Sequence, residues 1–206
     1  MLSARFIHAN CLRFLGKLIT LTALPIEMRI TVKITPCIHK SHAELHQAPV
    51  LVKNVIDIDC SASHLFAILE DGPAWPLWAS SLTEVIWTSP KPFSVGTTRT
   101  VMMTGGIVGN EEFVAWETDK QMAFCFTESS MPNMEAFGED YVLEALGENR
   151  VRLTWYAAFW PSNIIAKLSF ALFKPFMGFF LNGFLKKLKQ LAEGDYKPQP
   201  AVIAES

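Results

Sequence analysis

Two glutamates in the middle of the sequence could serve as acids or as polar anchors for a ligand. Glu128 follows Phe124 and Phe126 at every second position, and Glu139 precedes Tyr141 with the same spacing. Because successive side chains of a strand point to opposite faces, each glutamate shares a face with its aromatic neighbours. On a buried face such a carboxyl group has a raised pKa and can donate a proton. Near the strand ends, in solvent, both are ordinary carboxylates, and the sequence leaves the two interpretations open.

Histidine and cysteine offer little for nucleophilic or metal chemistry. His64 is the only histidine after residue 46, and it falls on a short helix that Ser61 can cap, where we interpret it as an ordinary helix residue. Cys37, His39 and His42 form a C-x-H-x-x-H pattern that could supply three metal ligands. A metal site also needs a held geometry and usually a fourth ligand, and this segment shows neither. We therefore expect no metal and no cofactor.

The adjacent acids and glycines near residue 110 do not form a recognisable site. Glu111 and Glu112 face opposite sides of a strand, so they cannot act as a carboxylate pair on one substrate. Gly105, Gly106 and Gly109 resemble a phosphate loop only in composition, because a strand pattern and not a helix follows them. We interpret them as a hairpin turn.

Predicted strands must position these residues. Alternating patterns cover residues 50–58, 83–88, 97–103, 111–117, 122–128, 136–146 and 150–159, and short helix patterns cover 61–69 and the turn that holds Trp75 and Trp78. The separators are short and rich in Gly, Pro, Asn and Asp, which indicates antiparallel hairpins, since parallel strands need long crossovers. The order is one strand, two short helices, six strands and a long helix, which predicts an α+β fold.

The long helix is the most apolar part of the chain. Residues 164–191 are apolar on most of the helix circumference, and the tightest stripe includes Phe176 and Phe180. The stretch from Phe170 to Leu185 is shorter than the roughly 20 residues that span a bilayer, and it contains Lys174. We interpret it as a buried or pocket-lining helix, not as a membrane span.

Composition limits the class of protein. The 206 residues are 50% hydrophobic and carry a formal net charge of −2, which fits one globular domain with an extension. Residues 1–45 are basic and the remainder is acidic, which argues against a nucleic-acid footprint. The four cysteines show no CxxC spacing, so a reducing, cytoplasmic location is expected. The basic N-terminal segment leaves organelle targeting as the alternative.

The same patterns divide the chain into three parts. Residues 1–45 lack clean alternation and are predicted to be a disordered basic extension, 46–195 form the domain, and 196–206 form a disordered tail.

Several motifs of the domain resemble one family. They are Val55 to Asp59, Ser61 to Phe66, Leu69 to Asp71, Trp75 to Trp78, and Arg150 to Trp155 followed by the helix that ends in Leu185 to Lys189. Their order is similar to the polyketide cyclase/dehydrase branch of the START-like (SRPBCC) superfamily. The resemblance implies the helix-grip fold, in which a seven-stranded antiparallel sheet curls around a long C-terminal helix and leaves a cavity for an apolar ligand.

We expect the pocket wall to be mainly aromatic. On the last strand Val151, Leu153 and Trp155 share the face that should meet the helix. The candidate ligand-binding residues are Trp75, Trp78, Phe124, Phe126, Glu128, Glu139, Tyr141, Trp155, Phe176 and Phe180. Packing in the core without ligand contact is the alternative role for each of them.

These observations favour a protein that binds or carries a small hydrophobic molecule, such as a lipid, a polyketide or an isoprenoid-like compound. The alternative is a cyclase or dehydratase acting on a polyketide-like substrate, in which Glu128, Glu139, Tyr141 or Tyr156 would supply protons. Expected partners are the apolar ligand and, through the lysines at the end of the long helix, a transient membrane contact. We expect a monomer or weak dimer and no nucleic acid.

Overall fold

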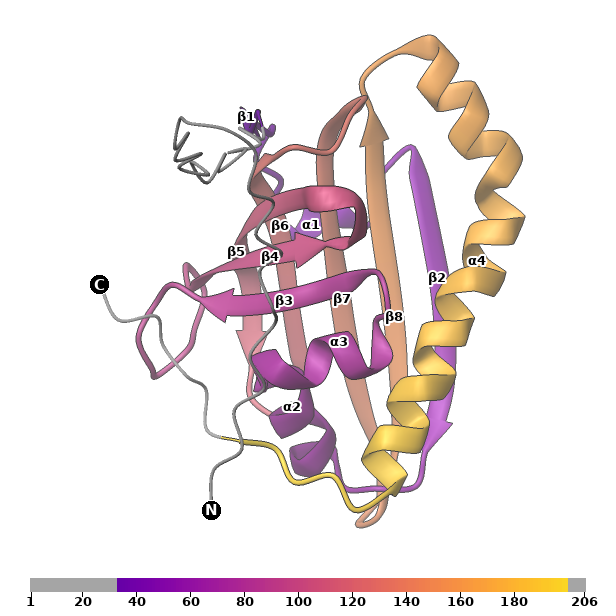
Figure 1. Ribbon diagram of the computed structural model, residues 1–206. Helices are drawn as coiled ribbons and strands as arrows, with labels where there is room; N and C mark the ends of the chain where they lie inside the picture. The colour runs from indigo at the N-terminus through magenta and orange to yellow at the C-terminus, as the bar shows by residue number, and fades with distance from the viewer. Residues whose placement is uncertain (1–32, 200–206) are drawn as a thin grey trace, which may run out of the picture. The chain divides into compact units, whose positions relative to one another are not determined.

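A computed structural model describes residues 33–199, and Figure 1 shows the arrangement of their helices and strands. The strands are β1 (Thr35–Pro36), β2 (Val50–Ile58), β3 (Leu82–Trp87), β4 (Thr98–Met103), β5 (Ile107–Glu117), β6 (Gln121–Ser129), β7 (Met134–Gly147) and β8 (Arg150–Pro161). The α-helices are α1 (His42–Leu45), α2 (Ala62–Glu70), α3 (Trp75–Trp78) and α4 (Ile164–Glu193), and two 3₁₀ turns are η1 (Gly72–Ala74) and η2 (Thr104–Gly106).

The strands form one antiparallel sheet in the order β2-β8-β7-β6-β5-β4-β3, and the short β1 pairs with β6. Helices α2 and α3 follow the first long strand, and α4 runs beside β2 and β8 (Figure 1). The predicted α+β helix-grip fold is confirmed, with β1 as an additional eighth strand.

The inner face of the sheet is the one that the alternation predicts. On β8 the side chains of Val151, Leu153 and Trp155 are buried, whereas Arg152 and Thr154 between them are partly exposed. The buried side chains join one hydrophobic core with α2, α3 and the end of α4. Burial of such side chains contributes most of the stability of a domain of this size.

The C-terminal part of α4 is the part that the core holds. Phe184, Leu185, Leu188 and Ala192 are buried in this core at helical spacing. A stripe at steps of three and four residues faces one side of a helix, so these four side chains fix the rotation of α4 against the sheet.

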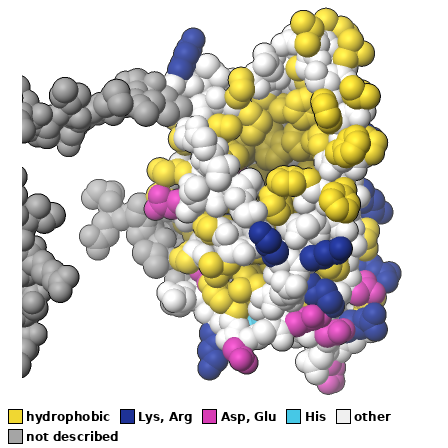
Figure 2. All heavy atoms as spheres, turned by 45° about the vertical axis from the view of Figure 1, so that its right-hand side comes forward, with side chains coloured by type: hydrophobic (Ala, Val, Ile, Leu, Met, Phe, Trp, Pro, Cys, Tyr) yellow, Lys and Arg dark blue, Asp and Glu magenta, His cyan; other side chains and the backbone are white. Residues whose placement is uncertain are grey.

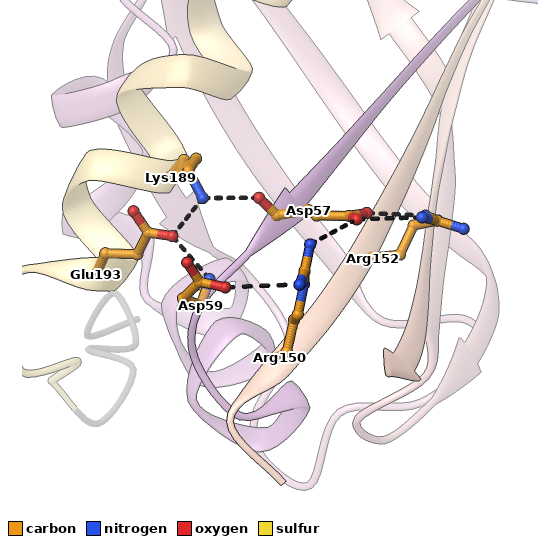
Figure 3. A network of polar contacts seen from close by, with 6 residues as sticks. All are labelled: Asp57, Asp59, Arg150, Arg152, Lys189 and Glu193. Carbon is orange, nitrogen blue, oxygen red and sulfur yellow. Dashed lines mark hydrogen bonds and ion pairs between the residues drawn. The ribbon is translucent and has the colours of Figure 1, made fainter. Parts of the chain in front are cut away.

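A polar network fastens the same end of α4 to the sheet edge (Figure 3). Lys189 donates to the backbone carbonyl of Asp57 at 2.8 Å, and Glu193 accepts from the backbone N–H of Asp59 at 2.7 Å. The carboxylate of Asp57 accepts from Arg152 at 2.8 and 3.1 Å, which holds its pKa below the usual value. Most of these groups face solvent, so the network orients the helix end more than it stabilises the fold.

The N-terminal half of α4 is not buried, contrary to the expectation of a covered helix. Its outward side chains form what we call the outer apolar face, with exposed fractions between 55% and 80%: Ile164, Ile165, Leu168, Leu172, Phe173, Phe176, Phe179 and Phe180. Nothing else in the described part of the chain covers them. By length and composition α4 could cross a bilayer, but its C-terminal part lies in the protein core.

The N-terminal prediction differs from the structure where the structure describes it. Residues 1–32 of the expected extension and residues 200–206 of the expected tail lie outside the described residues. Residues 33–45 contain β1 and α1, and Leu45 is completely buried against the outer face of the sheet. Of the tail, Tyr196 donates to Asp71 at 2.7 Å and the backbone of Gln199 does so at 2.9 Å. Both segments pack because a few apolar or polar anchors find partners on distant elements.

We predict that the two parts of α4 respond differently to truncation. Leu185→Ala should lower the free energy of unfolding by roughly 2 to 5 kcal/mol, because it leaves a cavity in the core. Phe179→Ala, at an 80% exposed position, should change it by less than about 0.5 kcal/mol. Urea denaturation measures both. Equal losses would contradict this division of the helix.

Candidate ligand-binding cavity

A cavity of about 440 Å³ lies between the inner face of the sheet, α3 and the middle of α4. Figure 2 shows it as a recess surrounded by hydrophobic side chains. Its walls are mainly aromatic, and Tyr141 and Trp155 stack at a ring distance of 5.5 Å. Phe180 lines the cavity and is also 59% exposed, so the opening lies beside the outer apolar face of α4.

The structure brings together eight of the ten residues predicted for the pocket wall. They are Trp75, Trp78, Phe124, Phe126, Glu139, Tyr141, Trp155 and Phe180. The same alternation that predicts the inner face of β6, β7 and β8 therefore selects most of the cavity wall.

Glu128 and Phe176 do not line the cavity. The pairing of β5 with β6 shifts between Asn110 and Glu111, which leaves Thr127 as an extra residue and reverses the alternation after it. Glu128 therefore points outward, is exposed and accepts a hydrogen bond from Asn110 at 2.9 Å. Phe176 is 70% exposed because it belongs to the outer apolar face of α4.

The cavity wall contains a buried ion pair that the strand patterns did not predict. Arg99 on β4 donates to Glu111, which lies directly opposite on β5, and both side chains are buried. Glu111 and Glu112 do face opposite sides, as expected, but the partner of Glu111 is a cation and not a second acid. Arg99 and Glu111 both occupy inward-facing positions of neighbouring predicted strands and have opposite charges, and this signal could have revealed the pair.

Arg99 is held by aromatic rings and keeps one donor free. Its guanidinium lies 4.2 Å from the ring centre of Trp75 and 4.6 Å from that of Phe124. Within residues 33–199, Arg99 Nη1 and the indole nitrogen of Trp78 are buried and make no hydrogen bond. Both side chains line the cavity. Since an unpaired buried donor is costly, this group of donors suits an acceptor oxygen on a bound molecule.

Glu139 and Tyr141 form a second polar pair, in which the tyrosine hydroxyl donates to an oxygen of the carboxyl group at 2.6 Å. Burial raises the pKa of Glu139 to about 8, the hydrogen bond from Tyr141 lowers it, and nearby Glu111 raises it further. Burial also raises the pKa of Tyr141 well above its usual value. Glu139 therefore carries a proton at neutral pH and can donate it within the cavity.

The described cavity wall contains no histidine or cysteine, so its chemistry rests on carboxyl, guanidinium, phenol and indole groups. An apolar molecule with one acceptor oxygen fits this set. Carboxylate oxygens can bind cations such as Ca²⁺ or Mg²⁺, but the carboxylate of Glu111 is already paired with Arg99.

Comparison with known proteins identifies the family of the chain. Residues 49–193 match the model of a family described as polyketide cyclase/dehydrase and lipid transport. The chain belongs to this family. The resemblance inferred from the motifs is thereby confirmed, and membership supports binding of a hydrophobic ligand in general.

The chain is also similar in sequence to several bacterial proteins and similar in fold to several solved structures. Uncharacterised proteins of Mycobacterium tuberculosis and Mycobacterium bovis are 40% identical over 161 residues, which cover 78% of this chain and 95% of theirs. A START superfamily protein from Mycobacterium smegmatis aligns with a TM-score of 0.58 at 14% identity, over 70% of this chain and 97% of that chain. A protein from Thermus thermophilus aligns with a TM-score of 0.56 at 14% identity, over 69% of this chain and 96% of that chain.

We predict that Glu139 makes stability fall as pH rises. Its folded-state pKa of about 8 lies above the usual value of 4.5, so between these values the folded protein keeps a proton that the unfolded chain releases. This contribution is fully present below about pH 4 and is lost as pH rises towards about 8, by a few kcal/mol in total. Urea unfolding at several pH values measures it.

Glu139→Gln is the matched control for this prediction. The variant stays neutral, so the difference between wild type and variant should change across the same pH range. A difference that stays constant would mean that the Glu139 carboxyl titrates normally.

Proposed function

We propose that the protein carries a small, mainly apolar molecule with one acceptor oxygen, of the lipid, polyketide or isoprenoid class, and exchanges it with a membrane. The observation that carries the proposal is an aromatic cavity whose opening lies beside the outer apolar face of α4.

The ligand class follows from the chemistry of the wall. A volume of about 440 Å³ lies within the usual range for small-molecule sites, and aromatic walls with few polar groups suit an apolar body. The free donors of Arg99 and Trp78 call for an acceptor such as a carbonyl or carboxylate. A ligand with both features would match the apolar wall and offer these donors an acceptor.

The outer apolar face favours a lipid bilayer as its partner. Monomeric soluble proteins seldom expose many large apolar side chains together, and such patches mark interaction sites. This face carries Ile, Leu and Phe side chains at the opening of the cavity, so a ligand leaving the bilayer there would pass from one apolar medium to another. An apolar helix face can bury itself about 5 to 10 Å deep at the boundary of headgroups and acyl chains.

Charge along α4 favours an anionic bilayer. The helix carries five lysines and one glutamate, whereas the rest of residues 46–206 carries seven Lys or Arg and seventeen Asp or Glu. Lys186 and Lys187 continue the direction of the outer apolar face after Asn182 and are exposed (Figure 2 shows basic side chains next to the apolar patch). Each lysine near an anionic surface contributes about 1 kcal/mol. The acidic remainder would be repelled, so α4 would face the membrane.

One observation favours catalysis as a second candidate. Glu139, protonated at neutral pH and hydrogen-bonded to Tyr141, could act as a general acid on a bound polyketide-like substrate, as in a cyclase or dehydratase. Turnover of a bound polyketone that stops in Glu139→Gln, with binding retained, would favour this candidate over simple carriage.

We predict that filling the cavity abolishes ligand binding. A conjugated, fluorescent fatty acid should bind the purified protein in a saturable 1:1 manner and quench the tryptophans of the wall. Leu181→Trp, in the cavity wall, should weaken binding by about tenfold or more. Phe179→Trp, on the same helix but pointing outward, is the matched control and should bind normally. Unchanged binding by Leu181→Trp would place the probe elsewhere.

We also predict that α4 carries membrane binding. The full chain should sediment with phosphatidylcholine vesicles that contain phosphatidylglycerol, and less with phosphatidylcholine alone. Phe176→Asp with Phe179→Asp should remove most binding, because two charges would have to enter the apolar layer. Lys186→Gln with Lys187→Gln should weaken it only on anionic vesicles and at low salt.

The control for the membrane experiment is Val95→Asp, a similar change at an exposed apolar position on a distant loop. It should bind vesicles as the wild type does. If the Phe176 and Phe179 variant instead loses self-association in sedimentation velocity and vesicle binding is unaffected, the outer apolar face is an interface between two copies of the chain and the membrane proposal is wrong.

A further inference from the structure

A cluster of potential metal ligands lies on the opposite side of the sheet from the cavity. His42 and His46 of α1 and Asp140 of β7 place their ligand atoms within 4.8 Å of one another. Asp140 precedes Tyr141, which lines the cavity, so its side chain points to the other face. The cluster is therefore separate from the ligand-binding site.

The sequence builds a support for α1 at this place. The Glu44 carboxylate accepts from the backbone N–H of Ser41 at 2.9 Å and from its hydroxyl at 2.7 Å, and Leu45 is completely buried in a small outer core. Gly138 allows this approach, because a Cβ at that position would lie 2.6 Å from Leu45 Cδ2. His42 and His46 are four residues apart and so lie on the same side of this turn.

The contacts within the cluster are short and compete with one another. Asp140 Oδ2 lies 2.8 Å from His46 Nε2 and 3.0 Å from His42 Nε2. The amide nitrogen of Gln121 lies 2.9 Å from Asp140 Oδ1 and also 2.9 Å from His42 Nε2. If His42 Nε2 carries a proton, it faces the N–H of Gln121; if it does not, its lone pair faces a carboxylate oxygen. Either tautomer leaves one contact between like groups.

We propose that His42, His46 and Asp140 bind one divalent transition-metal ion of the Zn²⁺ type. Two imidazole nitrogens and one carboxylate oxygen are a common three-residue ligand set for such ions. A cation between them would accept both histidine lone pairs and the Asp140 oxygen, which removes the competition at His42. Asp140 is completely buried, whereas the two histidine side chains are about a third exposed, so the fourth position faces solvent and can hold water.

The rest of the shell would hold these ligands in place. The His46 ring packs edge-on against Tyr156 at 4.7 Å, and Gln121 holds both oxygens of Asp140. Such outer contacts fix the orientation of metal ligands. Of the C-x-H-x-x-H pattern noted in the sequence, only His42 takes part. His39 instead lies near Glu112. The bound ion would fasten residues 41–46 to the outer face of the sheet.

The test is a titration of the full, metal-free chain with Zn²⁺ by calorimetry, and with Co²⁺ by its visible absorption. We expect one saturable site per chain, an absorption spectrum of tetrahedral or five-coordinate Co²⁺, and a higher thermal midpoint with the metal. His42→Ala and His46→Ala should each weaken Zn²⁺ binding by about tenfold or more.

His64→Ala and His39→Ala are the matched controls, since these histidines lie outside the cluster, and both should bind as the wild type does. Asp140→Asn is a second ligand variant, and circular dichroism of the metal-free protein checks its fold. Absence of stoichiometric binding would overturn the proposal. Equal affinity in wild type, His42→Ala and His46→Ala would overturn it too, because the metal would then bind elsewhere on the chain.

Discussion

The structure depends on the packing of the C-terminal end of α4 against the inner face of the sheet. Leu185 and Leu188 are completely buried there, next to the inner side chains of β2 and β8, and Lys189 and Glu193 fasten the helix end to the edge strand. One firmly held end lets the other half of a long helix extend past the core. That extension leaves space between helix and sheet, and the space is the cavity.

The cavity contains charges that an ordinary core would exclude. Transfer of Arg99 and Glu111 out of water is unfavourable, and their mutual attraction in an apolar medium offsets it only when both are well satisfied. Arg99 retains an unpaired Nη1, and Trp78 adds an unpaired indole donor. Burial of such polar groups is unfavourable unless each of them has a partner, which is not so for apolar side chains at the same positions. In the proposed carriage of a ligand, an acceptor oxygen would supply the missing partner, which would tie affinity to the polar end of the ligand as well as to its apolar body.

Much of the fold and cavity wall could be predicted because both rest on strand alternation. Trp155 and Tyr141 point inward as their parity requires. Glu128 could not be placed, because one extra residue in β6 reverses the parity and leaves no mark in composition. The exposure of Phe176 could not be predicted either, because an apolar helix has the same sequence pattern whether or not the rest of the protein covers it. Alternation places Arg99 and Glu111 on the inner face, but their pairing also needed the register between the two strands. The docking of Leu45 needed a contact between distant elements, which local patterns do not contain.

Strand β7 connects the two faces of the molecule. Glu139 and Tyr141 point into the cavity, whereas Asp140 between them points to α1. Burial raises the pKa of Glu139 to about 8, which favours the neutral form of this inward carboxyl group at physiological pH. Gly138 beside them lets Leu45 approach the backbone, so the position of α1 depends on the same few residues of β7 that shape the cavity wall. A change that shifts β7 at this point therefore acts on the ligand site and on the outer histidine cluster together, although the sheet separates them.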